Sequence, residues 1–81
     1  MIVTLRFFAQ VRERAGCSSM TLELPEGSRV SDAMAVVERR FPGLAALRPH
    51  LAVAVDQRLA AGDAVLTGGV EIALLPPVSG G

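Results

Sequence analysis

The strongest constraint on the fold is one amphipathic helix pattern that stands between short strand patterns. Between residues 28 and 41, apolar residues recur at helical spacing, at Val30, Ala33, Met34, Val37 and Phe41. Ser28 is expected to cap this helix, and Pro42-Gly43 is expected to end it. A lone helix buries its apolar stripe by packing across a sheet, so the pattern favours an α+β fold.

Alternating apolar and polar residues predict two strands in the first third of the chain, over residues 2–8 and 20–24. The polar stretch between them, residues 10–19, predicts a short helical turn or a loop. We therefore expect the two strands to pair antiparallel across a long connection.

The second half of the chain predicts two more apolar strands, over residues 51–55 and 70–75, with a turn at Asp56-Gln57 and a short strand between them. The first and last strands are both long and apolar, so we expect them to form a central parallel pair. This is the ubiquitin-like β-grasp arrangement, with the folded domain over residues 1–75 and an extended tail over residues 76–81.

Composition narrows the class of partner. A chain of 81 residues makes one domain, and its net charge of zero, without a basic stripe, argues against nucleic acid. No apolar run approaches the ~18–20 residues that span a bilayer, so no membrane partner is expected. With a single cysteine and no signal-peptide layout, the chain is expected to be cytoplasmic.

The sequence holds no catalytic constellation of its own. Cys17 and His50 lie too far apart in the sequence to suggest a metal ligand set, and each is expected to be incidental. No carboxylate pair has the spacing for general acid–base work, and no Gly-rich loop precedes a helix. We expect no metal and no intrinsically bound cofactor.

The carboxyl end carries the clearest functional signal. Gly80 and Gly81 have no Cβ and can enter a slot too narrow for other residues, which leaves the terminal carboxylate as the functional group. Pro76 and Pro77 favour an extended approach, and residues 76–81 can reach about 20 Å. The shape suits insertion into another protein's active site; a frayed terminus is the alternative.

Apolar residues that face away from the predicted core give a second signal. If Val3, Leu5, Phe7, Ile72 and Leu74 form the core, Phe8 and Leu75 lie on the opposite sheet face, where Leu59 can join them. Such a patch beside the tail predicts a docking surface, unless loops cover it.

Three segments of the sequence resemble the small subunit of molybdopterin synthase, a ubiquitin-like sulfur carrier. They are Phe-Phe-Ala-Gln-Val-Arg-Glu (residues 7–13), Val-Ala-Val-Asp-Gln (residues 53–57) and Leu-Pro-Pro-Val-Ser-Gly-Gly (residues 75–81). The resemblance covers the whole chain in length and order, and its first and last segments are fairly specific.

The resemblance implies a sulfur-carrying subunit of a sulfurtransferase rather than an enzyme on its own. In that family a ubiquitin-activating-like adenylyltransferase activates the terminal glycine with ATP, and a sulfur donor enzyme converts it to a thiocarboxylate. The tail then enters the large synthase subunit, where the sulfur passes to a cyclic pyranopterin precursor of the molybdenum cofactor. Gly81 is expected to bear the sulfur, and the residues expected to bind partners are Phe8, Leu59, Leu75, Pro76, Pro77, Val78, Ser79 and Gly80.

Three other functions remain open at this point. A sulfur carrier for thiamine thiazole or cysteine synthesis shares the fold and the diglycine, although residues 7–13 favour the pterin pathway. A protein-conjugating modifier would form a ladder of high-mass conjugates. A plain interaction module would tolerate loss of Gly81.

Overall fold

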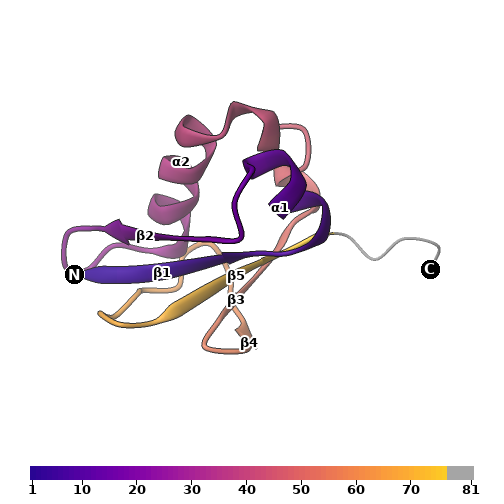
Figure 1. The fold of residues 1–81 in the computed structure, drawn as a ribbon. Coiled ribbons are helices and arrows are strands. Elements are labelled where there is room, and N and C mark those ends of the chain that lie inside the picture. The colour runs from indigo at the N-terminus through magenta and orange to yellow at the C-terminus, as the bar shows by residue number, and fades with distance from the viewer. Residues whose placement is uncertain (77–81) are drawn as a thin grey trace.

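The strands nearest the two ends of the sequence, β1 (Ile2–Phe7) and β5 (Glu71–Leu75), lie side by side in the middle of one sheet (Figure 1). The structure is a computed structural model, and it describes residues 1–76. The sheet has five strands in the order β2-β1-β5-β3-β4. The remaining elements are α1 (Ala9–Ala15), β2 (Ser19–Glu23), α2 (Val30–Arg40), the 3-10 turns η1 (Pro42–Leu44) and η2 (Arg48–His50), β3 (Ala52–Val55) and β4 (Arg58–Leu59).

The strand pairing confirms the predicted β-grasp topology. β1 pairs antiparallel with β2 and parallel with β5, with Leu5 opposite Ile72 in the parallel pair. β5 pairs antiparallel with β3, which in turn pairs antiparallel with β4. The last strand is therefore held on both sides before the chain leaves it.

The core lies between one face of the sheet and the two helices, which cover that face together (Figure 1). Val3, Leu5, Ile72 and Leu74 are fully buried, and Phe7 is 1% exposed. The alternation in β1 and β5 thus places every second side chain inside, as predicted. The helices and η1 close the core with Val11, Val30, Ala33, Met34, Val37 and Leu44.

The start of α2 differs from the prediction, because Ser28 does not cap it. The helix begins at Val30, and the residue before it, Arg29, donates its backbone N–H to Asp32 Oδ2 at 2.7 Å. Ser28 is buried and its hydroxyl donates to the carbonyl of Pro25. A β-bridge between Arg29 and Val65 keeps the chain extended through Arg29, which delays the helix.

The other helix and strand ends lie within one or two residues of the predicted ends. At Phe8 the structure shows why the end differs. β1 ends at Phe7 rather than Phe8, because Phe8 keeps an extended backbone and its carbonyl accepts the first helical hydrogen bond of α1, from Val11 at 3.0 Å. The stretch predicted as a helical turn or loop contains α1, which ends at Gly16 with a φ of 79°.

A two-residue turn joins β3 to β4, as predicted. Both of its residues have positive φ, 48° at Asp56 and 70° at Gln57, as in the hairpin turns that match strand twist. Asp56 also ties the turn to β5, because its carboxylate accepts the backbone N–H of Glu71 at 2.9 Å and its own N–H donates to the carbonyl of Glu71.

Candidate functional site

β5 positions the tail from the centre of the sheet. Its Leu74 is fully buried and pairs with Phe7 of β1 and Val53 of β3, and Leu75 pairs with Ala52. The direction in which the chain leaves is therefore fixed by two ladders. Pro76, half-buried, is the last described residue. Pro77, Val78, Ser79, Gly80 and Gly81 lie outside the described residues, and their roles stay predictions.

The sheet face away from the helices gathers apolar side chains from three strands. Because Ile72 and Leu74 point into the core, Ala73 and Leu75 point outward. One row of paired residues crosses this face from Arg6 through Ala73 and Ala54 to Leu59. Ile2 also faces outward, at the far end of β1. We call the remaining apolar residues of this face the outer-face patch: Phe8, Ala52, Ala54, Leu59, Ala73 and Leu75.

The predicted docking residues Phe8, Leu59 and Leu75 all belong to the outer-face patch. Leu59 is 77% exposed and Phe8 is 39% exposed, whereas Leu75 is half-buried. Phe8 and Leu75 follow Phe7 and Leu74, the last pair of the β1–β5 ladder, so both lie at the end of the sheet from which the tail departs. The structure brings them to one face, and their role in docking stays a prediction.

Sequence reasoning missed the three alanines of the patch. They lie between the larger side chains of the patch, and Ala54 is only 7% exposed although it lies outside the core cluster. The signal was present in the alternation of β3 and β5, but a single alanine carries little hydrophobic weight in such a pattern. Which alanine lies beside Leu59 depends on the β3–β4 register. That register could not be predicted from the sequence, because β4 has only two residues.

Arg6 borders the patch and was also missed. Its guanidinium lies 5.9 Å from the centre of the Phe8 ring, and its Nη1 is 3.5 Å from Glu71 Oε2. Both charged side chains are about half exposed, so this pair contributes little to stability. Arg6 therefore adds a positive charge beside the Phe8 ring at one end of the patch.

The described residues hold no group of side chains that could bind a metal ion. Among residues 1–76, no three His, Cys, Asp or Glu side chains come together as metal ligands. Cys17 packs against the core beside β2, and His50 is exposed in η2, so the two do not meet. Within the same residues, none of the helices is long and apolar enough to cross a membrane.

The five-stranded mixed sheet with its central parallel pair and crossing helix defines a ubiquitin-like β-grasp domain. The ThiS family model matches residues 5–81. The chain therefore belongs to the ThiS family.

Relatives and solved structures agree with this assignment. The molybdopterin synthase sulfur carrier subunit of Homo sapiens is 38% identical over 82 residues, which cover 98% of this chain and 93% of the relative. SAMP1, the small archaeal modifier protein 1 of Haloferax volcanii, superposes with a TM-score of 0.90 at 27% identity over 100% of both chains. One chain in the protein–protein complex of subunits 1 and 2 of the molybdopterin-converting factor from Helicobacter pylori superposes with a TM-score of 0.76, at 27% identity over 100% of both chains.

Proposed function

We propose that this chain is the sulfur carrier subunit of molybdopterin synthase. The observation that carries the proposal is the placement of β5, which aims the carboxyl end away from the centre of the sheet beside the outer-face patch. The full-length likeness to the human sulfur carrier subunit supports it, and so does the likeness to a subunit of the Helicobacter pylori complex. The partner of the patch is then the large synthase subunit.

The chemistry of the carrier follows from the state of its terminal group. A carboxylate is ionised at neutral pH and is a poor electrophile. An adenylyltransferase partner would join a Gly81 carboxylate oxygen to the α-phosphorus of ATP and release pyrophosphate. A sulfur donor enzyme would then deliver a sulfide equivalent to the acyl carbon, with AMP as the leaving group, to form the thiocarboxylate.

The transfer step takes place on the partner. Docking of the outer-face patch would place the tail in the large subunit, away from bulk solvent, where the thiocarboxylate sulfur attacks a carbon of the pyranopterin precursor and displaces an oxygen substituent from that carbon. One water molecule admitted to the site then adds to the acyl carbon and cleaves the acyl–sulfur bond, which leaves sulfur on the pterin and restores the Gly81 carboxylate. The partners would therefore supply the nucleotide site and the catalytic groups. This chain would carry the sulfur on Gly81 and place it in the active site of the partner.

Mass spectrometry of the intact chain tests the proposal. After incubation with the adenylyltransferase, ATP and a sulfur source, the mass is expected to rise by one oxygen-to-sulfur exchange, and fragmentation is expected to place it on Gly81. Sulfur found on Cys17 alone, or no added sulfur, would contradict the carrier function.

A second candidate function, protein modification, is favoured by the likeness to SAMP1. It predicts isopeptide bonds between Gly81 and lysines of other proteins. Denaturing gels of a tagged chain in its own cells separate the two: a carrier leaves the tagged chain at its own mass, whereas a modifier gives a ladder that disappears when Gly81 is removed.

A further inference from the structure

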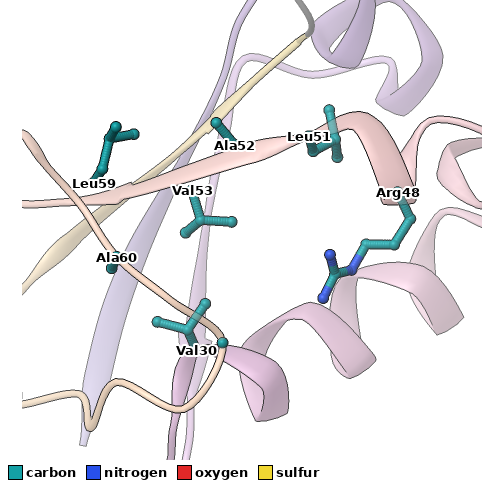
Figure 2. A pocket seen from close by; sticks show the side chains of 8 residues that line it. Val30, Arg48, Leu51, Ala52, Val53, Leu59 and Ala60 are labelled. Carbon is teal, nitrogen blue, oxygen red and sulfur yellow. The ribbon is translucent and has the colours of Figure 1, made fainter.

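A groove of about 310 Å³ opens between α2 and the free edge of β3 (Figure 2). Val30 and Val53 form its apolar floor and are 1% and 8% exposed. Leu51 and Ala60 line it as half-buried apolar residues. The side chain of Arg48 extends from η2 toward the space beside α2, where its Nε lies 3.1 Å from Glu38 Oε1.

The groove exists because β4 is too short to cover β3. β4 pairs with Ala54 and Val55 alone, and after it the N–H of Ala60 donates to the carbonyl of Val53 at 2.9 Å. The chain then turns toward the start of α2, where the carbonyl of Gly62 accepts the N–H of Ser31. The β3 edge on the amino-terminal side of Val53 is therefore open next to apolar side chains.

The groove is continuous with the outer-face patch. Leu59 and Ala52 belong to the patch and also line the groove. Ala52 is moreover the pairing partner of Leu75, the last residue of the strand that leads into the tail. A protein that receives the tail and covers Leu59 and Ala52 therefore meets the rim of the groove, and the apolar side chains of its floor would lose contact on one side if nothing entered.

We propose that the large subunit inserts one apolar side chain, of leucine or phenylalanine size, into this groove when it docks. The inference rests on the proposed function, since it names how the partner of that function is held. The apolar floor fits the side chain, and Arg48, which lines the groove and pairs with Glu38, offers N–H groups to the partner's backbone. The groove acts as an anchor point, while the tail carries the sulfur.

Methyl NMR of the full chain, titrated with the large subunit, tests the contact directly. The methyl groups of Val30, Leu51 and Val53 are expected to shift and to show intermolecular contacts with one partner side chain. Val36, which lines a different hollow on the other side of α2, is the control and is expected to stay unchanged. Normal binding without contacts to these three groove residues overturns the inference while leaving the proposed function intact.

A groove-filling variant tests the energetics. Ala60→Leu places a larger side chain in the groove and is expected to raise the Kd for the large subunit by about tenfold or more, since the anchor can no longer enter. Ala35→Leu makes the same change on the exposed surface of α2 and is expected to leave the Kd unchanged. If Ala60→Leu does not fold, Ala60→Val fills part of the groove at the same position and replaces it.

Three further results would overturn the inference. An unchanged Kd for the folded groove-filling variant overturns the inference. Self-association of the chain alone, with methyl contacts between two copies, would make a second copy the occupant and overturn it as well. Failure of the unaltered chain both to gain sulfur on Gly81 and to bind the large subunit would overturn the proposed function and this inference together.

Discussion

Leu59→Ala gives the sharpest test of the outer-face patch. Leu59 is 77% exposed, so the free chain gains little from it. Fully burying a leucine contributes about 1.5–3 kcal/mol, and about three quarters of that, roughly 1–2 kcal/mol, is still available to an interface. The variant is therefore expected to raise the Kd for the large subunit about 5- to 30-fold.

Isothermal titration calorimetry measures the Kd for the large subunit, and thermal unfolding measures the stability of the free chain. The Tm is expected to fall by no more than about 4 °C, because the folded chain buries only a quarter of the side chain. Ile2→Ala is the matched control, since Ile2 is 57% exposed and pairs with Glu23 at the opposite end of the sheet. It is expected to leave the Kd unchanged.

Two results would refute the reasoning. Equal affinity for Leu59→Ala and the unaltered chain would remove Leu59 from the interface. An equal loss of affinity in Leu59→Ala and Ile2→Ala would show that the effect does not depend on the patch.

Four further predictions follow from the same structure. Leu75→Glu is expected to abolish measurable binding while circular dichroism shows an intact fold, because Leu75 lies outside the core cluster and an unpaired charge at an apolar interface costs several kcal/mol; global unfolding would contradict the orientation. One alanine added after Gly81 is expected to leave the Tm unchanged and to stop sulfur transfer, since it moves the carboxyl by about 3.3–3.6 Å, and an equal product yield would end the carrier mechanism. Gln57→Gly is expected to raise stability by about 0.5–1 kcal/mol in chemical denaturation, because Gln57 has a φ of 70°, and a loss of stability would argue against strain there. Arg6→Ala is expected to weaken large-subunit binding by about threefold with an unchanged Tm, because the Phe8 ring loses its cation partner, and unchanged affinity would make Arg6 a bystander.

The main strands and the central parallel pair were predictable because they depend on local alternation and on apolar length. Val3, Leu5, Ile72 and Leu74 repeat at every second position, and all four are fully buried. The outward placement of Leu75 follows from the same period.

The parts that could not be predicted depend on contacts between distant segments. The bridge from Arg29 to Val65 delays α2, and neither residue carries a local sign of it. The groove needs three separate segments, around Val30, Leu51 and Ala60, to converge beside an edge left open by a strand of two residues. Arg6 reaches Phe8 because the chain stays extended through Phe8 before α1 begins.

The central position of β5 has a mechanical consequence. A partner that grips the chain beyond Pro76 and draws on it pulls β5 along its own axis. That load is shared by the hydrogen bonds to β1 and to β3, whereas a strand at the sheet edge would have only one neighbouring strand to resist the same pull. The sheet therefore resists extraction of β5 with two ladders.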